Sequence, residues 1–340
     1  MEHRENQVTS TSSSFLVPLR LPTPFAVGPV NVYLLEGPEL TLVDVGPDTA
    51  EALAALEAGL AAHGHALTEL RHIVITHAHP DHYGLAARLA ALSGARVYCH
   101  PLSRRVMAAT PAELTQRYAW YGEWLRQAGL PEPIQAQLLE LFRSLEGQRG
   151  VPADRLVELN DGDRLPWGDR EWQALHTPGH AQGHLCFYHR PSGTLLAGDH
   201  LLRGITPNPS VEPPWPGSSE RPRSLVQYFQ SLKRLTALDI TTIWPGHGEP
   251  IYDYQAHLEE LSAFHRRRAE EIAALLDGES QTVYQLTQRF FPRLQRLDLF
   301  LGLSEVIAHL DLLEAGGRVS VSAADGVLRY RLTDEPHSAA

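Results

Sequence analysis

Residues 76–82, T-H-A-H-P-D-H, constrain this chain more than any other stretch of its sequence. They directly follow Ile73-Val74-Ile75, an apolar run that is typical of a buried parallel strand. Loops at the carboxyl ends of such strands are the usual place for ligand-binding side chains in α/β proteins. Imidazole and carboxylate groups at this spacing suit a metal ion, and a polar turn with incidental histidines is the simpler alternative. The candidate metal ligands of this loop are His77, His79, Asp81 and His82.

Three further candidate ligands stand at the ends of other predicted strands. One follows a T-P-G turn, one ends the run L-L-A-G-D, and one lies in P-G-H-G after the run T-I-W. These residues are His180, Asp199 and His247. Two more histidines, His184 and His200, lie beside them. We expect these two to support the ligands through hydrogen bonds, and direct metal binding is the alternative.

Seven candidate ligands are more than one metal ion needs, because a metal usually takes three or four ligands from the protein. We therefore expect two divalent ions, about 3.5 to 4 Å apart, that share a water molecule and lower its pKa. Such a pair aims a hydroxide at a carbonyl or phosphoryl centre, so no protein nucleophile is required. Ligation by nitrogen and oxygen suits zinc first, and also manganese or iron. We expect a first trio, His77, His79 and His180, to bind one ion and a second trio, Asp81, His82 and His247, to bind the other. Asp199 is expected to bridge the two ions.

Composition argues against several other classes of protein. The formal net charge is −11, so the surface as a whole repels phosphate backbones, and nucleic-acid binding needs a local basic patch. Cys99 and Cys186 are the two cysteines, so no disulfide framework or thiolate cluster is expected. The single lysine, Lys233, argues against Schiff-base chemistry. The first residues form no apolar leader, and no run of about 18 apolar residues follows, so we expect a cytoplasmic protein without a membrane span.

The order of predicted elements indicates an α/β domain followed by a smaller unit. Residues 1–14 have the composition of a disordered tail. Residues 15–270 alternate short strands and helices, as a layered sheet does, and we assign them to one catalytic domain. Residues 101–150 interrupt the alternation with a helical insertion, which includes a capping box at Thr110-Pro111-Ala112-Glu113.

Two segments of the catalytic domain could shape a substrate pocket. The insertion carries aromatic residues at helical spacing, and we expect them to pack it onto the domain, with a lid over a pocket as the alternative. The Pro-rich residues 204–222 follow Asp199 and either line the site or decorate the surface. The aromatic residues at this spacing are Tyr118, Trp120, Tyr121 and Trp124.

Residues 271–340 form the second predicted unit, with helices at Thr282–Phe291 and Ser304–Glu314 and two strands turned at Asp325-Gly326. This order resembles a winged helix, which suggests nucleic-acid binding. The second helix, however, carries three acidic side chains and no Arg or Lys, the reverse of what phosphate contact needs. We therefore expect this unit to pack against the catalytic domain or against a second copy of the chain.

Taken together, the motifs resemble the metallo-β-lactamase superfamily and, within it, hydrolases of the glyoxalase II-like branch. The resemblance covers residues 15–270 and rests on HxHxDH, T-P-G-H, G-D and the histidine of P-G-H-G. It implies an αββα sandwich, a two-metal site divided as above, and hydrolysis by a metal-bridging hydroxide. We expect Asp81 and Asp199 to be the catalytic residues. Members that hydrolyse β-lactams carry cysteine where Asp199 stands, so antibiotic hydrolysis is not expected.

The C-terminal unit resembles the winged-helix tail of lactamase-like endoribonucleases, which leaves more than one function open. The leading hypothesis is a metal-dependent hydrolase of a small ester, thioester or lactone. The alternative is a metal-dependent endoribonuclease acting on single-stranded RNA, which the tail favours and the negative charge opposes. A third hypothesis, a winged-helix regulator without activity, is opposed by the complete set of ligands. The expected partners are a small-molecule substrate and a second copy of the chain. We do not expect the chain to bind a membrane.

Overall fold

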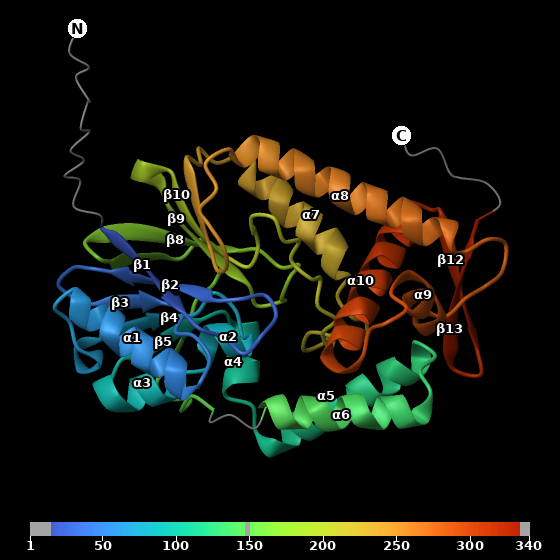
Figure 1. Cartoon of the computed structure of the whole chain (residues 1–340), viewed down its shortest axis with the longest axis horizontal. Coiled ribbons are helices and arrows are strands. Elements are labelled where there is room, and N and C mark those ends of the chain that lie inside the picture. The colour runs from blue at the N-terminus through green and yellow to red at the C-terminus, as the bar shows by residue number, and fades with distance from the viewer. Residues whose placement is uncertain (1–14, 147–149, 334–340) are drawn as a thin grey trace, which may run out of the picture.

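The computed structural model describes residues 15–146 and 150–333. The predicted tail, residues 1–14, lies outside the described residues. Two sheets lie face to face in one half of the molecule, with helices against the outer face of each (Figure 1). The predicted αββα sandwich is therefore confirmed. Within the described ranges, no helix is both long enough and apolar enough to cross a lipid bilayer.

The first sheet has six strands, which lie side by side in sequence order. Its first three strands are antiparallel neighbours, whereas the third to the sixth run parallel. The carboxyl ends of the parallel strands share one edge of the sheet, and the loop with the H-x-H-x-D-H motif emerges there. The strands are β1 (Leu16–Leu21), β2 (Val30–Leu35), β3 (Thr41–Val43), β4 (His72–Val74), β5 (Arg96–Cys99) and β6 (Leu156–Glu158).

The second sheet has five strands in the order β11-β10-β9-β8-β7. Neighbours are antiparallel except for β10 and β11, which run parallel. Gly198 pairs with Pro245 at the carboxyl ends of those two strands, so the residues that follow them enter the same edge of the sheet. The strands are β7 (Arg164–Trp167), β8 (Arg170–His176), β9 (Leu185–His189), β10 (Thr194–Gly198) and β11 (Thr242–Pro245).

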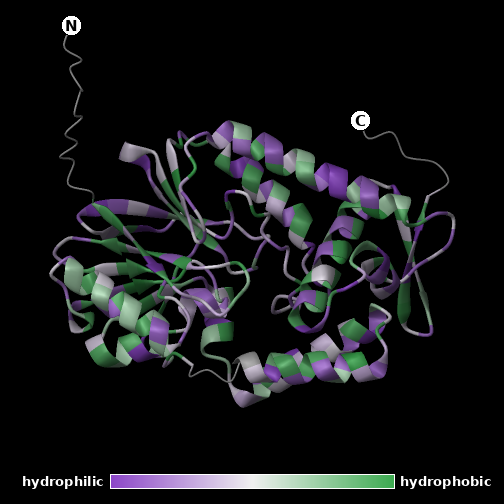
Figure 2. Ribbon diagram, in the orientation of Figure 1, coloured by the Kyte–Doolittle hydropathy of each residue, from purple (hydrophilic) through white to green (hydrophobic). Residues whose placement is uncertain are grey.

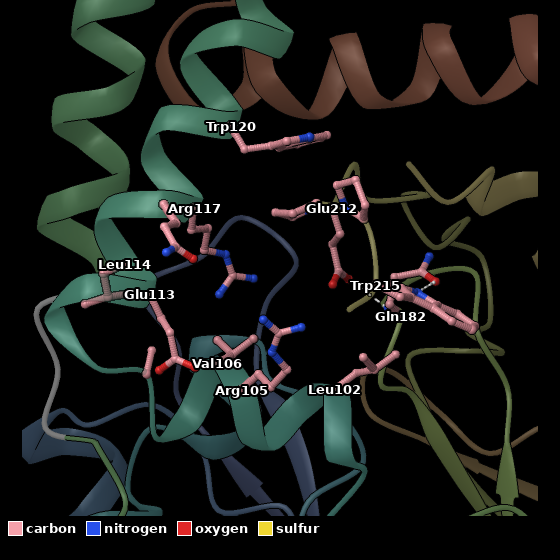
Figure 3. A pocket seen from close by; sticks show the side chains of 14 residues that line it. Leu102, Arg105, Val106, Glu113, Leu114, Arg117, Trp120, Gln182, Glu212 and Trp215 are labelled. Carbon is pink, nitrogen blue, oxygen red and sulfur yellow. Dashed lines mark hydrogen bonds between the residues drawn. The ribbon is translucent and has the colours of Figure 1, made fainter. Parts of the chain in front are cut away.

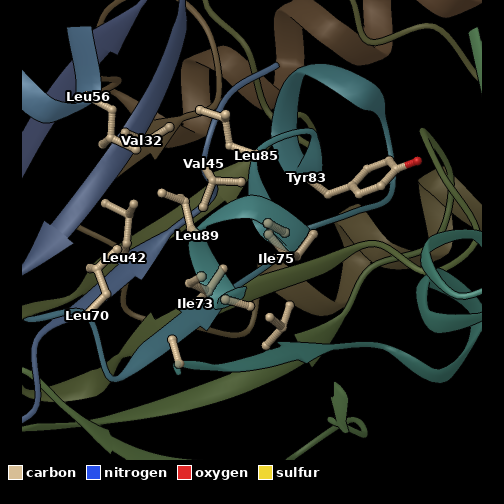
Figure 4. Close-up of a cluster of buried hydrophobic side chains, with 14 of the residues drawn as sticks. Val32, Leu42, Val45, Leu56, Leu70, Ile73, Ile75, Tyr83, Leu85 and Leu89 are labelled. Carbon is tan, nitrogen blue, oxygen red and sulfur yellow. The ribbon is translucent and has the colours of Figure 1, made fainter. Parts of the chain in front are cut away.

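Helices cover the outer face of each sheet. Figure 4 shows the core on the first sheet, where Leu56 and Leu89 of two helices meet Leu42 and Ile73 of the strands. Two further helices cover the second sheet in the same way. These helices are α1 (Ala50–Ala62), α3 (Ala86–Ser93), α7 (Ser224–Leu235) and α8 (Tyr254–Ala274), and two 3-10 turns lie at Leu67–Glu69 and Arg190–Ser192.

The side chains of β2 alternate between two buried cores. Tyr33 and Leu35 point between the sheets, where they share a core with Trp167 and Trp172 of the second sheet. Val32 points the other way, into the core under α1 and α3. Because both faces of this strand are buried, it is apolar at nearly every position, and Figure 2 shows hydrophobic residues concentrated in the strands of the sandwich.

The insertion consists of three helices. The predicted capping box is confirmed, because Thr110 Oγ1 accepts a hydrogen bond from Glu113 N at 3.3 Å and Glu113 Oε2 accepts one from Thr110 N at 2.8 Å. Trp124 and Phe142 pack around Phe300 of the C-terminal unit, with ring centroids 6.0 and 4.8 Å away. The insertion therefore packs against the C-terminal unit. Its helices are α4 (Pro101–Met107), α5 (Pro111–Gln127) and α6 (Glu132–Glu146).

The C-terminal unit has the predicted order of two helices and a two-stranded hairpin. Its second helix begins at Arg296, not at the predicted Ser304. Gly302, a poor helix former, lies inside it because a Cβ there would collide with Leu294. The winged-helix assignment and the domain division at residues 270 and 271 stay predictions. The elements are α9 (Val283–Phe290), α10 (Arg296–Ala315), β12 (Val319–Ala324) and β13 (Val327–Leu332).

Candidate metal centre

The loop after β4 is fixed on both sides. Leu185 N donates a hydrogen bond to the Thr76 carbonyl at 2.8 Å, which ties the loop to the start of β9. Thr76 N donates to Asp44 Oδ1 at 2.8 Å, which ties it to the end of β3. The short helix α2 (Pro80–Tyr83) then begins with proline at its first position. This turn brings the last two residues of the H-x-H-x-D-H motif into the same space as the first two.

The first predicted trio converges on one point. His77 Nε2 and His180 Nε2 each lie 2.9 Å from His79 Nδ1. The outer nitrogens of two rings are held from behind, since His180 Nδ1 donates to the Asn208 carbonyl at 2.8 Å and His77 Nδ1 lies 3.0 Å from Thr76 Oγ1. Three imidazole nitrogens at this spacing can bind one metal ion.

The second predicted trio lies beside the first. His247 Nε2 lies 3.4 Å from Asp81 Oδ2, and the three ligand atoms of this trio lie within 4.8 Å of one another. The outer nitrogen of His82 donates to Asp44 Oδ2 at 2.8 Å, and that of His247 donates to the Pro29 carbonyl at 2.9 Å. These contacts fix which ring nitrogen faces the centre.

Asp199 lies between the two trios. Its Oδ1 is 3.4 Å from His82 Nε2. Its Oδ2 is 3.6 Å from His247 Nε2 and 3.8 Å from His180 Nε2. The carboxylate thus faces imidazoles of both trios, and all seven predicted residues come together.

Several buried polar atoms of this centre have no hydrogen-bond partner among the described residues. They are His82 Nε2, Asp199 Oδ1 and His247 Nε2. An unpaired buried polar atom costs about 1 to 3 kcal/mol, so such atoms in one place require an explanation. Divalent cations at the two trios would satisfy all three. The side chains therefore fit metal ions.

Burial sets the protonation of the histidines. It lowers the pKa of His79 to about 3, with a neighbouring imidazole acting in the same direction, and it holds the pKa of His77 well below its usual value. Both rings are therefore neutral at pH 7, the form that binds a metal. Burial also acts to lower the pKa of His82, but the carboxylates of Asp199 and Asp44 outweigh it and raise that pKa. A cation held by the second trio would bind His82 in its neutral form and so would compete with a proton there.

The sequence profile of the metallo-beta-lactamase superfamily matches residues 26–247, which include all seven site residues. The chain belongs to this superfamily. It is 36% identical over 300 residues to "Probable metallo-hydrolase YqjP" of Bacillus subtilis, covering 88% of this chain and 92% of that protein. The crystal structure of a metallo-beta-lactamase family protein from Thermus thermophilus aligns with a TM-score of 0.79 at 33% identity, covering 94% of this chain and 99% of the other. The chain also matches a hydroxyacylglutathione hydrolase of Synechocystis over a shorter stretch, with 32% identity over 114 residues. This alignment covers 32% of this chain and 40% of that protein.

Membership in the metallo-beta-lactamase superfamily implies that the chain is a metallo-hydrolase and that it binds divalent metal ions.

Two residues that support the centre were not predicted from the sequence. Asp44 contacts both Thr76 and His82, as described above, although nothing but its place at a strand end indicated it. Gly246 leaves room for the site, because a Cβ there would collide with Asp199 Oδ1. The sequence indicated this role only through the position of Gly246 between Pro245 and the candidate ligand His247.

The two histidines beside the centre differ in their contacts. His184 Nδ1 lies 2.9 Å from Thr177 Oγ1, and its Nε2 accepts a hydrogen bond from Asp199 N at 3.2 Å. It therefore supports the backbone of Asp199 from behind. His200 packs its ring against Tyr228 at 4.8 Å between centroids, and neither ring nitrogen has a partner in the described part of the chain. Neither histidine belongs to the trios of the centre.

A cavity of about 460 Å³ opens beside the centre. The Pro-rich residues 204–222 line it from Ile205 to Glu212, so the lining role predicted as one alternative is confirmed. Tyr121 and Phe142 of the insertion line the same cavity. The insertion therefore both packs against the C-terminal unit and forms part of the cavity wall. Four of the seven site residues face the cavity: His79, Asp81, His180 and Asp199.

A second, smaller cavity of about 210 Å³ adjoins the first. Figure 3 shows the guanidinium groups of Arg105 and Arg117 pointing into it, with Glu113 and Glu212 nearby. Burial raises the pKa of Glu212, and Arg117 acts against this shift. Leu102, Val106, Arg117 and Glu212 line both cavities.

One other group of metal-ligating side chains lies away from the centre, within the residues described. It joins His265 of α8 to Glu305 and His309 of α10. Its carboxylate already has a cationic partner, because Arg268 Nη1 lies 3.1 Å from Glu305 Oε1. His309 Nδ1 donates to the Glu305 carbonyl at 2.7 Å, and His265 Nδ1 lies 3.2 Å from His309 Nε2. These contacts form a buried network that joins two helices, and we assign no metal to it.

Proposed function

We propose that the chain is a dinuclear metal-dependent hydrolase of the glyoxalase II-like branch that cleaves a small ester, thioester or lactone. The observation that carries this proposal is the position of Asp199, whose carboxylate faces imidazoles of both trios, with Oδ1 toward His82 and Oδ2 toward His180 and His247. A carboxylate placed between two sets of imidazoles suits two ions, with zinc as the first candidate. The partial match to a hydroxyacylglutathione hydrolase supports an acyl substrate.

Two divalent ions, when bound, supply an activated water and polarise the carbonyl of the substrate. The protein's own residues fix the geometry in which this chemistry operates. The outer nitrogens of three imidazoles donate to acceptors that hold each ring in one orientation. The adjoining cavity positions the substrate and limits access of bulk water. The imidazole and acceptor pairs are His82 with Asp44, His180 with the Asn208 carbonyl, and His247 with the Pro29 carbonyl.

An endoribonuclease is less well supported by the same surroundings. Phosphate groups bind Arg and Lys, yet Arg117 is the single such residue among the described residues that line the cavity. The acidic side chains of α10 are also paired within the protein, because Asp311 binds Arg221 and Glu314 binds Arg223. A small uncharged substrate therefore fits the site better than RNA does.

The proposal is tested by metal content together with Asp199→Ala. We expect about two metal ions per chain in gently purified protein, and loss of nearly all turnover in the variant with its fold retained. The measurements are elemental analysis, circular dichroism, and rates on an ester, a thioester, a lactone and a single-stranded RNA. Asp154→Ala, which removes an exposed carboxylate, is the matched control.

Two results would contradict the proposal. A reproducible single ion, with Asp81 and His247 replaceable without loss of metal, excludes the dinuclear centre. Cleavage of the RNA with no cleavage of the ester, thioester or lactone replaces the proposed substrate class by the alternative one.

A further inference from the structure

We propose that the cavity of about 460 Å³ binds the apolar acyl group of the substrate, so that the preferred substrates are esters or thioesters of medium-chain acids. This inference rests on the proposed function, because it places the acyl carbon beside the metal centre. In the reaction, the hydroxyl group of water joins the acyl carbon as its bond to oxygen or sulfur breaks. The remaining proton leaves with the alcohol or thiol.

The wall of the cavity is assembled from segments that are distant in sequence. Phe25 precedes β2, Phe142 lies on α6 of the insertion, Val211 follows β10, and Phe300 lies on α10 of the C-terminal unit. Each of these four contributes an aromatic or aliphatic side chain. Cavities of about 300 to 1,000 Å³ with linings of this kind are typical sites for organic ligands.

Two polar side chains of the wall, Ser103 and Tyr121, already have partners within the protein, whereas Asn208 Oδ1 has none among the described residues. Ser103 Oγ donates a hydrogen bond to the Gly183 carbonyl at 2.9 Å. Tyr121 OH donates to the Val211 carbonyl at 3.2 Å. Because these two hydroxyl groups are satisfied without a ligand, an apolar occupant leaves neither of them unpaired. The surface offered to the substrate here is mainly carbon.

The charges around the cavity argue for a neutral occupant. Away from the metal centre, whose ions would offset the charge of Asp81 and Asp199, the described lining has one cationic residue, Arg117, and two carboxylic acids, Glu212 and Asp298. An anionic chain would meet more negative than positive groups, and an alkyl chain meets no charge penalty. The acidic lining residues are Asp81, Asp199, Glu212 and Asp298.

Hydrogen bonds connect the apolar wall directly to the metal centre. His180 Nδ1 donates to the Asn208 carbonyl at 2.8 Å, and Asn208 Nδ2 donates to the Leu301 carbonyl at 2.9 Å. Leu301 lines the cavity next to Phe300. The α10 wall is thus held in a fixed position relative to His180. This fixed distance determines how far a bound acyl chain extends from the reacting carbon.

The volume of the cavity sets the size of the acyl group. At about 30 Å³ per group, the share of one water molecule in the liquid, about 460 Å³ holds on the order of 15 non-hydrogen atoms. An octanoyl chain occupies a large part of this space, whereas an acetyl group leaves most of it empty. Each buried methylene can improve binding by about fourfold at most.

The first experiment compares p-nitrophenyl acetate, butyrate and octanoate with the metal-loaded protein. We expect kcat/KM to rise along this series, and to be at least about tenfold higher for octanoate than for acetate. Calorimetry with free octanoate and free acetate provides a readout that needs no turnover. We expect octanoate to bind at least about tenfold more tightly, because both acids share the carboxylate and differ in the chain.

Two substitutions fill the cavity from two different segments of the chain. Leu297→Trp enlarges a partly buried residue of α10, and Ile205→Trp enlarges a lining residue that is 43% exposed and therefore tolerant of change. We expect each to reduce the octanoate-to-acetate ratio of kcat/KM about tenfold. Arg293→Trp adds the same side chain at an exposed position outside the cavity and is the matched control. Thermal melting verifies that each variant folds.

The outcomes separate this inference from the proposed function. Equal rates for all three esters and equal binding of the two acids overturn the acyl site while leaving the hydrolase intact. Preferential binding of octanoate that Leu297→Trp and Ile205→Trp abolish, with no ester, thioester or lactone cleaved, supports the apolar site and overturns the hydrolase. A chain-length preference that persists in both filled variants also overturns the assignment to this cavity.

Discussion

At the scale of single residues, the centre depends on side chains that stand behind the predicted ligands. Asp44 is 2% exposed and has a φ of +57°, a backbone conformation that residues other than glycine seldom adopt. Its Oδ2 accepts hydrogen bonds from Thr76 Oγ1 and His82 Nδ1, both at 2.8 Å. Strained backbone of this kind persists where the surrounding structure requires it. Asp44 is therefore a positioning residue for His82.

We expect Asp44→Asn to weaken metal binding about 10- to 100-fold, with the loss at the second trio. An amide has one acceptor oxygen, so it cannot accept every hydrogen bond that the carboxylate accepts. Chelator competition measures the metal affinity, and kcat/KM on the cleaved ester is followed in parallel. Asp48→Asn, in the same segment and with a side chain that is 29% exposed, is the matched control. Equal affinities in the two variants would remove Asp44 from this role.

The seven site residues could be predicted because their spacing in short motifs encodes them, and the structure brings all seven together. Asp44 could not be predicted in the same way. Its partner His82 lies 38 residues further along the chain, and the sequence D-V-G-P at a strand end marks no particular contact. Contacts of that range depend on which strands become neighbours, and this is decided by the packing of the whole sheet.

At the scale of elements, the surroundings of α10 explain its acidic residues. Asp311 receives two hydrogen bonds from Arg221 at 2.5 and 2.7 Å, and Glu305 receives one from Arg268 at 3.1 Å. Both carboxylates are buried, so neither faces a nucleic acid. The sequence predicted the helix and its lack of phosphate contacts. Its start at Arg296 and its partners could not be predicted, because those partners lie on segments 37 and 90 residues away.

The buried histidines between α8 and α10 make stability depend on pH. Burial lowers the pKa of His265 to about 3 and that of His309 to about 4. An unfolded chain therefore binds protons on these rings below pH 6.5 when the folded chain does not, and stability falls as the pH falls. Burial raises the pKa of Glu305 to about 7, so its effect has the opposite sign. The two histidines together outweigh the one carboxylate.

We expect His309→Gln to reduce the stability lost between pH 7 and pH 5 by about 2 kcal/mol. Glutamine occupies a similar volume and takes up no proton, so the contribution of His309 disappears while those of His265 and Glu305 remain. Urea unfolding at several pH values measures the difference between variant and wild type. His63→Gln changes an exposed histidine in the same way and controls for the substitution. An unchanged slope in His309→Gln would contradict the assignment.

At the scale of the whole molecule, the insertion and the C-terminal unit share one hydrophobic core. Trp124 of α5 and Phe142 of α6 lie in the same cluster as Ile272 of α8 and Leu303 of α10. Figure 1 shows the α5–α6 pair below one end of α10. The sequence predicted that the insertion packs onto the catalytic domain, and that the C-terminal unit packs against that domain or against a second copy of the chain. It could not show that they pack on each other, because neither stretch contains a motif that identifies the surface it packs against.

Truncation after Gly278 tests this shared core and the role of the C-terminal unit together. It removes α9, α10 and both strands of the hairpin, so the apolar faces of α5, α6 and α8 lose their cover. A single buried leucine replaced by alanine already costs about 2 to 5 kcal/mol, and this truncation removes several such residues at once. We expect the midpoint of thermal unfolding to fall by at least about 10 °C, or the protein to aggregate. Truncation after Thr333, which leaves every described residue in place, is the control.

The same truncation distinguishes a substrate wall from a nucleic-acid module. All seven site residues remain, but the Leu301 carbonyl that holds Asn208, and through it His180, is lost. We therefore expect the truncated protein to lose ester turnover more than it loses metal, as measured by elemental analysis and kcat/KM on the same sample. RNA binding by the full chain should be weak at every salt concentration. Salt-sensitive RNA binding that disappears on truncation would instead assign the unit to nucleic acid, because phosphate contacts weaken steeply as salt is added.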